Sequence, residues 1–448
     1  MRVHYHTFGC KANQYDTERM RQEAEALGAD TVGGLEGADV VVVNTCTVTN
    51  QADADARRYI RRVQRRHPEA RIVVAGCSAA LKSPDYEALG VHGVVEGHDP
   101  VRVAGAMLEA NAPGAPAPGG LVQLTDRRRL DRLDVEPVGG TLLRRRHGAT
   151  RGWLKIQDGC DRRCAFCATR LARGASRSRA VAEVVAEARM LAQSHPELVL
   201  TGVHIGHYGI DLDEGATLSS LVAALLDAVP DVRLRLGSVE ATEIDDLLIE
   251  LMASSGGRLA PHLHMPLQSG ADPVLRRMRR WHTREQYRRR ALEIATRIPV
   301  LGLGADIITG FPGETGADHA DTVALVDELP FTYLHVFPFS PRDSTVAADL
   351  QREMPVPQRV AGERSRELRE QVAAKGDAYR RRRAGSSATV VVEDGGNALT
   401  GDYLRVRLDE GAGRPPGDTL HVGRLQRSGD ELYIDLSRVP LAPTATPS

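Results

Sequence analysis

The chain has 448 residues, of which 42% are hydrophobic and 26% are charged, and its formal net charge is −1. This composition excludes collagen-like, fibrous and wholly disordered proteins, and the length suits about three domains. No uncharged apolar stretch reaches the roughly 18 residues of a membrane span, and the first residues lack the apolar core of a signal peptide. We therefore expect a cytoplasmic protein with no membrane partner.

The basic residues are almost all arginines: the chain has four lysines and 54 arginines. Several arginines form runs, such as 127–129 and 380–383. Arginine's planar guanidinium suits phosphate contacts, although a run can equally be a solvated helix surface. Because basic and acidic residues nearly balance, the net charge alone does not indicate a nucleic-acid-binding protein.

The first hundred residues alternate short β-branched runs with helical stretches, a pattern typical of a parallel sheet covered by helices. The predicted strands are 3–8, 39–44 and 71–75, and a cysteine follows each of them: Cys10, Cys46 and Cys77. Because the carboxyl ends of parallel strands form one edge, three cysteines distant in sequence can converge there. The alternative is that each cysteine is a small buried residue placed by chance.

A stretch rich in proline and glycine, residues 111–120, predicts an interdomain linker. Strands and helices alternate again from about Gly152, with six predicted strands at 153–157, 198–201, 232–236, 262–267, 305–309 and 333–339. Predicted helices between them include 180–193 and 219–228. Six such units are fewer than the eight of a closed barrel, so we expect an open partial barrel with its site at the strand carboxyl ends.

A charged helix is predicted over 359–383, and a small terminal module follows it. Short runs at 387–393, 402–408, 419–422 and 431–436 are separated by Gly, Asp and Pro residues, which is typical of a small antiparallel barrel. Barrels of this size often bind oligonucleotides, but the fold alone does not establish that function.

The second group of cysteines, Cys160, Cys164 and Cys167, has the spacing C-x-x-x-C-x-x-C directly after the first barrel strand. Zinc sites prefer four ligands, and neither a fourth cysteine nor a nearby histidine completes this group. Three thiolates suit a [4Fe-4S] cluster that keeps one iron free of protein ligands. That iron can take a substrate, as an open catalytic metal site does.

With this motif on the first strand of a six-unit barrel, the chain resembles a radical S-adenosylmethionine (SAM) enzyme. The segments around the first cysteines, 8–14, 44–49 and 75–77, resemble the amino-terminal domain of the methylthiotransferases. Further matches to that family lie at 173–178, 200–203, 266–270, 310–315 and 335–340. The resemblance implies two [4Fe-4S] clusters, one held by each trio of cysteines, with SAM as cosubstrate. It names no catalytic residue beyond the six cluster ligands.

The resemblance covers nearly the whole chain and implies an α/β protein of three parts. We expect an amino-terminal open parallel α/β domain over 1–111 and a linker and bridging segment over 112–148. A partial (β/α)6 radical SAM barrel over 149–384 precedes a small antiparallel β-barrel of the RNA-binding TRAM type over 385–441.

Within the family, residues 9–15 are most similar to the MtaB group, which methylthiolates threonylcarbamoyl-adenosine beside the tRNA anticodon. The implied partners are a tRNA anticodon stem-loop and an electron donor such as flavodoxin or ferredoxin. Two alternatives use the same chemistry on isopentenyl-adenosine of tRNA or on an aspartate of a ribosomal protein. A third, of another class, is a non-enzymatic iron-sulfur protein that binds RNA as a regulator.

Four further barrel residues are candidates for SAM binding: Gly202, Gln268, Ser269 and Gly310. Each has a structural alternative, because a glycine can mark a turn and polar side chains can stabilise a loop. The chain departs from the family at Arg170, where proline is usual, and at Gly237, a common serine position. Neither departure removes a cluster ligand, so both bear on local loop shape.

Overall fold

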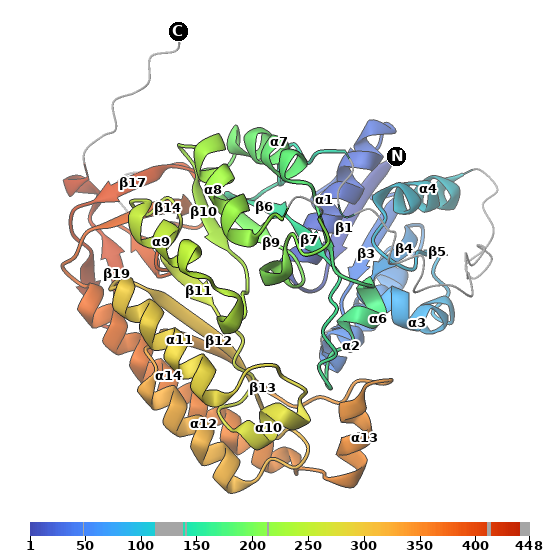
Figure 1. Ribbon diagram of the computed structural model, residues 1–448. Helices are drawn as coiled ribbons and strands as arrows, with labels where there is room; N and C mark the ends of the chain where they lie inside the picture. Colours follow the sequence, from blue (N-terminus) through green and yellow to red (C-terminus); the bar gives the residue numbers. More distant parts are fainter. Residues whose placement is uncertain (48, 113–137, 139–140, 213–214, 410–413, 440–448) are drawn as a thin grey trace.

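The computed structural model describes residues 1–47, 49–112, 138, 141–212, 215–409 and 414–439 (Figure 1). Most of the predicted 112–148 segment, including the proline- and glycine-rich stretch after residue 112, lies outside the described residues. None of the described helices is long and apolar enough to cross a membrane.

The amino-terminal region is a five-stranded parallel sheet with the strand order β2-β1-β3-β4-β5. Every residue of its central strand is buried, as expected of a parallel strand covered on both faces. The elements are β1 (Arg2–Thr7), α1 (Lys11–Ala26), β2 (Asp30–Thr31), β3 (Val40–Thr45), α2 (Asn50–Arg66), β4 (Arg71–Gly76), α3 (Cys77–Glu87), β5 (Gly93–Val94) and α4 (Pro100–Asn111).

Two pairs of helices cover the two faces of this sheet. Helices α1 and α4 pack on each other over one apolar cluster, which includes Met20 and Met107. Helices α2 and α3 share the other cluster, which includes Ile60 and Tyr86. All three predicted strands are present within one or two residues, and a cysteine follows each of them. The predicted open parallel α/β fold is confirmed.

The central region places its six main strands side by side in chain order. Two three-stranded parallel sheets, β6-β9-β10 and β11-β12-β13, are joined by parallel bridges at Leu234↔Leu259 and Ser238↔His264. The strands are β6 (Arg151–Lys155), β9 (Glu197–Thr201), β10 (Arg233–Leu236), β11 (His262–His264), β12 (Gly302–Thr309) and β13 (Tyr333–Pro338). This is the predicted partial barrel.

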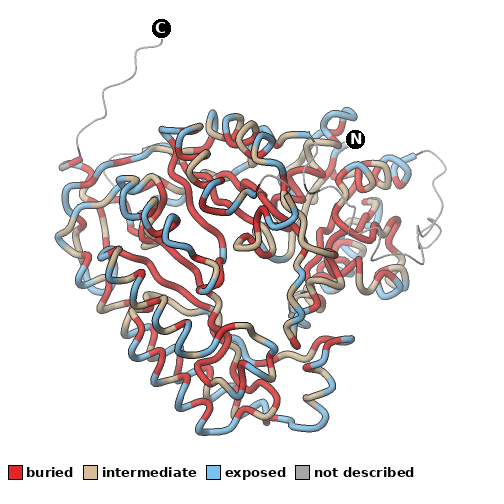
Figure 2. Tube along the Cα trace, viewed as in Figure 1, coloured by how far each residue is buried: buried red, intermediate tan, exposed pale blue. Residues whose placement is uncertain are grey.

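The helices of this region lie between these strands in the chain or follow β13 (Figure 1). They are α6 (Thr169–Arg173), α7 (Val181–Ala192), α8 (Leu218–Ala228), α9 (Asp246–Ser254), α10 (Asp272–Arg277), α11 (Arg284–Arg297), α12 (Gly316–Glu328), α13 (Val346–Glu353) and α14 (Gln358–Arg383), with short elements β7 (Gln157–Asp158), β8 (Arg177–Ser178), η1 (Ile205–His207) and η2 (Ala241–Glu243). Strand β11 ends earlier than predicted, because Pro266 has no N–H for a sheet hydrogen bond. Figure 2 shows the strands buried and the outer helix surfaces exposed.

The carboxyl-terminal module is a six-stranded sheet with the order β17-β14-β15-β16-β19-β18. Its elements are β14 (Ala388–Glu393), β15 (Asn397–Thr400), β16 (Arg405–Leu408), β17 (Thr419–Val422), β18 (Gln426–Ser428), β19 (Glu431–Ile434) and η3 (Leu436–Arg438). The sheet is mostly antiparallel, as predicted, but β16 and β19 pair in parallel. Strands β15 and β18 were not predicted.

A buried polar seam fixes this module to the barrel. Arg233 and Arg235 form ion pairs with Glu197 and donate hydrogen bonds to carbonyls of the module, among them Leu399 O and Gly401 O. Burial alone would raise the pKa of Glu197, but the two arginines outweigh it and lower that pKa to about 2. Because Glu197 begins β9, the module sits at the amino ends of the strands and leaves their carboxyl ends free.

Candidate metal and cofactor site

The first three cysteines lie at the carboxyl ends of neighbouring parallel strands. Cys10 precedes α1, Cys46 directly follows β3, and Cys77 is the first residue of α3. The Sγ atoms of Cys10 and Cys77 lie 3.8 and 3.6 Å from the same atom, Asn13 Oδ1. The predicted convergence of residues distant in sequence therefore occurs.

Glycine 9 is required for this convergence. Its φ of +109° is rarely adopted by residues with a side chain, and a Cβ atom there would lie 2.7 Å from Cys46 Cβ and 2.8 Å from Cys46 Sγ. Only glycine lets the backbone before Cys10 approach Cys46 this closely.

The second three cysteines occupy one loop between β7 and α6. Cys160 Sγ lies 3.6 Å from His204 Nδ1, and Arg280 Nη1 donates to Cys164 Sγ at 3.6 Å. Cys167 Sγ lies 3.0 Å from Thr169 Oγ1. All six cysteines are free thiols.

In both groups, burial and the neighbouring cysteines disfavour ionisation of the thiols unless a cation is bound. Burial raises the pKa of Cys77 to about 12, and neighbouring Cys46 and Cys10 add to that rise. Burial likewise raises the pKa of Cys160 to about 12, with Cys167 and Cys164 adding to it. A bound metal cluster removes this penalty by neutralising the clustered thiolates. The donor set, three sulfurs and no fourth cysteine in each group, therefore fits a [4Fe-4S] cluster with one open iron.

Arg173 links the two cysteine groups. Its side chain is 2% exposed, and its Nε donates to Cys77 Sγ at 3.3 Å. Its Nη1 donates to both oxygens of Asp158 at 2.9 Å, and Nη2 donates to Asn13 Oδ1 and to Asp16. Because Asp158 Oδ1 accepts from the Gly159 N–H beside Cys160, one guanidinium connects the first group to the loop of the second.

This network was not predicted, because arginine followed by glycine at 173–174 has no sequence signal of burial. Lys155 completes it by pairing with Asp16 at 2.7 Å and with Asp158 at 2.5 Å. Its two cations neutralise two buried carboxylates, and the pKa values of both Asp16 and Asp158 are lowered despite their burial. The amino-terminal domain and the barrel are thereby fixed to each other at the site.

A second polar cluster, also not predicted, surrounds Cys160. His204 Nε2 lies 2.9 Å from Glu243, and His207 Nε2 lies 3.1 Å from the same carboxylate. Hydrogen bonds from these histidines lower the pKa of Glu243 to about 2, although burial acts in the opposite direction. The same His204 ring lies beside a cluster cysteine, with its Nδ1 3.6 Å from Cys160 Sγ.

A cavity of about 170 Å³ lies beside the second group of cysteines. Phe166, between Cys164 and Cys167, forms part of its wall with aromatic and aliphatic residues of β12 and β13 and the polar side chains of Thr49 and Arg342. Mostly apolar walls with a few polar groups are typical of sites for small organic ligands.

Of the four residues predicted to bind SAM, Gln268 lines this cavity. The buried Ser269 hydroxyl accepts a hydrogen bond from Ala271 N at 3.2 Å. A Cβ atom at Gly202 would lie 2.7 Å from Gln157 O, and one at Gly310 would lie 2.4 Å from Ala361 Cβ. Close packing within the chain thus accounts for both glycines, and their assignment to SAM stays a prediction.

Two sequence families match this chain. Residues 2–93 match the uncharacterized protein family UPF0004, and residues 154–326 match the radical SAM superfamily. In fold, the chain is similar to the radical SAM methyltransferase TsrM from Kitasatospora setae, with a TM-score of 0.54 and 17% identity over 75% of this chain and 74% of that one.

Several relatives match most of the length of this chain. A threonylcarbamoyladenosine tRNA methylthiotransferase MtaB from Rickettsia prowazekii is 33% identical over 90% of each chain. Its namesake from Bacillus subtilis is 37% identical over 79% of this chain and 76% of its own. A tRNA-2-methylthio-N(6)-dimethylallyladenosine synthase from Thermobifida fusca is 30% identical over 93% of this chain and 85% of its own. The chain belongs to the threonylcarbamoyladenosine tRNA methylthiotransferase family.

Proposed function

We propose that this protein inserts a methylthio group at carbon 2 of threonylcarbamoyl-adenosine beside the tRNA anticodon, using SAM and two [4Fe-4S] clusters. The observation that carries the proposal is the pair of cysteine trios joined through Arg173 at the carboxyl ends of two parallel sheets. Cys10, Cys46 and Cys77 would hold one cluster, and Cys160, Cys164 and Cys167 the other.

The chemistry of the substrate requires such cofactors. An aromatic C–H on adenine cannot be deprotonated by a side chain whose pKa is tuned by a few units. Bound clusters supply a one-electron source for SAM cleavage and a site for sulfur, and radical chemistry belongs to the cofactors.

The residues of this chain hold and shield these groups. Arg280, paired with Glu240 at 2.5 Å, presents a positive charge to Cys164, and Arg173 does the same for Cys77. Such hydrogen bonds to sulfur stabilise thiolates and tune reduction potentials. Cys46 and Cys77 are buried whereas Cys10 is exposed, so a cluster held by these three residues would be covered by protein at two of its ligands and accessible at the third.

The cavity lined by Phe166 and Gln268 is the proposed place for SAM. Its rings offer a face for the adenine of SAM, and Gln268, with a φ of +66°, holds a strained backbone at its edge. Gly202 directly after β9, Ser269 in the loop after β11 and Gly310 directly after β12 stay proposed supporting residues for SAM. An electron donor such as flavodoxin or ferredoxin and a cytoplasmic location complete the proposal.

The deciding experiment is mass analysis of tRNA nucleosides from a strain that lacks the gene. We expect loss of 2-methylthio-threonylcarbamoyl-adenosine, with threonylcarbamoyl-adenosine accumulating, and restoration by the wild-type gene. Loss of the isopentenyl product instead, or an unmodified ribosomal aspartate with normal tRNA, would assign the alternative substrates.

A matched pair of variants separates the two clusters in vitro. Anaerobic reconstitution of the wild type should give about eight irons per chain, four for each cubane. Cys164→Ala should abolish 5′-deoxyadenosine formation from SAM. Cys46→Ala should retain it and lose only the methylthio product. Absence of 5′-deoxyadenosine from the reduced wild type would support a non-enzymatic regulator instead.

A further inference from the structure

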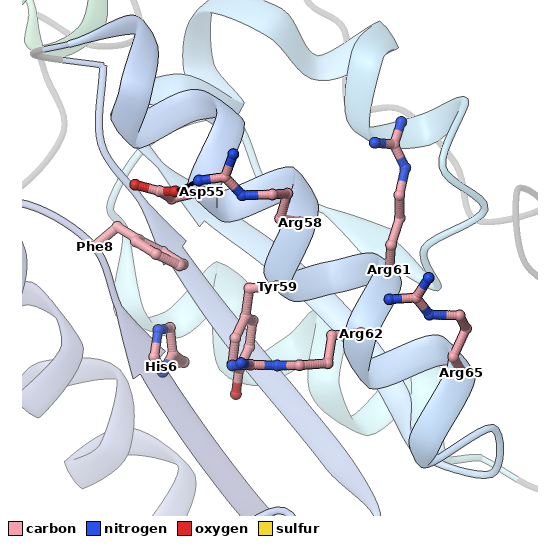
Figure 3. Close-up of a pocket in the computed structure, with 8 residues that line it drawn as sticks. All are labelled: His6, Phe8, Asp55, Arg58, Tyr59, Arg61, Arg62 and Arg65. Carbon is pink, nitrogen blue, oxygen red and sulfur yellow. Dashed lines mark hydrogen bonds and ion pairs between the residues drawn. The ribbon is translucent and has the colours of Figure 1, made fainter.

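A hollow of about 600 Å³ opens beside the first cysteine trio, between β1 and α2 (Figure 3). Four arginines of α2 extend along it, and aromatic rings from β1 and α2 form its wall. We name it the arginine groove, and its residues are His6, Phe8, Asp55, Arg58, Tyr59, Arg61, Arg62 and Arg65.

The groove is open because of the way the helices cover the sheet. Successive residues of a strand face opposite sides, so Val3 and Tyr5 of β1 face the α1–α4 cluster. His6 and Phe8 face the α2 side, where α2 and α3 pack on β3 and β4, and both remain half-buried. The sheet thus presents a strip of aromatic surface at its β1 side.

The charge along the groove is strongly positive and is not neutralised within the protein. Residues 56–68 contain six arginines and no Asp or Glu. Arg58 pairs with Asp55, but among the described residues no ion pair involves Arg61, Arg62 or Arg65. Like charges four residues apart destabilise a helix, so the arginines spaced in this way do not stabilise α2 by themselves. A bound polyanion would remove the penalty.

The wall of the groove supplies aromatic rings. The His6 ring stacks on Tyr59 with centroids 3.9 Å apart, and Phe8 meets His6 edge-on at 4.6 Å. Burial, with His4 and Arg62 nearby, lowers the pKa of His6 to about 4, so this ring is uncharged at neutral pH. Tyr59 is 94% buried, and its hydroxyl has no hydrogen-bond partner among the described residues.

Of the two arginine runs noted in the sequence, only 380–383 can be compared with the groove. Residues 127–129 lie outside the described part of the chain. In the 380–383 run, Arg381 pairs with Asp377, and the buried Arg383 pairs with Asp402 at 2.8 Å. Those two charges are paired within the protein. In the groove, Arg62 lies over the Tyr59 ring, and Arg61 and Arg65 extend from α2 with no ion-pair partner among the described residues (Figure 3).

We propose that the arginine groove binds a strand of the RNA substrate, with Arg61, Arg62 and Arg65 on its phosphates and a base or ribose against His6 and Phe8. A positive track beside stacking rings is the arrangement with which proteins hold single-stranded nucleic acid. Phe8 is two residues from Cys10, so the groove leads away from the first cluster site. This inference rests on the proposed function, because it takes RNA as the substrate.

The test compares two triple variants of the full-length reconstituted protein, each lacking three positive charges. One is Arg61→Gln/Arg62→Gln/Arg65→Gln, and the control is Arg288→Gln/Arg289→Gln/Arg297→Gln on α11, far from α2 in Figure 1. Binding of an anticodon stem-loop RNA is measured by fluorescence anisotropy over a range of salt concentrations. Thermal unfolding of both variants is measured in parallel.

We expect the groove variant to bind at least about tenfold more weakly at low salt. The slope of log K against log salt should become shallower by about 2 to 3, because each neutralised phosphate contributes about 0.7 to 0.9. Its unfolding temperature should not fall, since removing like charges relieves repulsion. Equal affinities and slopes for the groove and control variants would overturn the proposal.

Two further outcomes distinguish this inference from the proposed function. If the wild type binds the RNA with the steeper slope but forms no methylthio product, the proposed function fails and the groove stands. If the wild type forms product and the groove variant binds RNA like the control, the groove fails and the function stands. Displacement of the RNA by poly-glutamate at equal charge concentration would also overturn it, because the groove would then be a site for an acidic protein.

Discussion

The two cysteine trios gather three thiols in opposite ways. In the first, the cysteines are 36 and 31 residues apart and meet only because three parallel strands lie in register. In the second, all three lie within residues 160–167 on one loop. The first site therefore depends on close backbone approach between separate strands, whereas the spacing of the second is set within one loop. An arginine donates to one sulfur in each trio.

The largest expected effect comes from breaking the first trio at its backbone. Gly9→Ala places a methyl group against Cys46 at a φ of +109°, so we expect about four irons per chain instead of about eight. Methylthio product should be lost, while 5′-deoxyadenosine still forms. The control is Gly105→Ala in α4, where a Cβ atom meets nothing within 4 Å. Full iron loading of Gly9→Ala would show that the trio does not require this approach.

The next effect concerns the connection between the trios. Arg173→Gln removes one of the two buried cations that pair with Asp16 and Asp158, and we expect a loss of about 3 to 5 kcal/mol in the free energy of unfolding. Arg173→Lys, which keeps the charge, should recover part of it. Urea unfolding of the iron-free protein provides the measurement, with the exposed Arg189→Gln as control. A loss below about 1 kcal/mol would mean that the trios are joined by other contacts.

A redox titration of the same variant sharpens the comparison. Arg173 donates to Cys77 of the first trio and touches no sulfur of the second. Removing Arg173 should lower the midpoint potential of the first cluster, because the loss of a hydrogen bond to a cluster sulfur favours the oxidised state. The midpoint potential of the second cluster should stay nearly unchanged. Equal shifts of both potentials would indicate a general change in the site.

A pH dependence is expected at the seam behind the barrel, outside both trios. The pKa of Glu197 is about 2 in the folded protein against an ordinary 4.5. Its contribution to the free energy of unfolding is therefore complete above pH 4.5 and is lost as the pH falls toward 2. We expect the stability advantage of wild type over Glu197→Gln to shrink by up to about 3 kcal/mol in that window. Urea unfolding of iron-free protein at several pH values tests this. The exposed Glu431→Gln should show no such trend.

The smallest effect is expected at Arg170, which stands where the family usually has proline. Its ion pair with Asp161 is partly exposed, at 38% and 54% for the two side chains. Arg170→Ala should change the free energy of unfolding by less than about 1 kcal/mol and leave iron loading of the second trio intact. Loss of that cluster would show that the loop depends on this pair as well as on its cysteine spacing.

The six cysteines, the order of strands and helices, and the partial barrel could all be inferred from the sequence. Periodic apolar patterns and the C-x-x-x-C-x-x-C spacing are local features that can be read from the order of residues. The strand-end positions of Cys10, Cys46 and Cys77 also followed, because parallel strands share one carboxyl edge.

The link between the two trios and the position of the unpaired surface charge became visible in the folded chain and not before. Arg173 carries no sign of burial in the sequence, and it becomes the link because Asp16, Asp158 and Cys77 converge on it from separate elements. The six arginines of α2 resemble those of other helices until packing leaves one side of β1 uncovered beside them. Burial and charge pairing arise between distant segments, so residue order alone does not contain them.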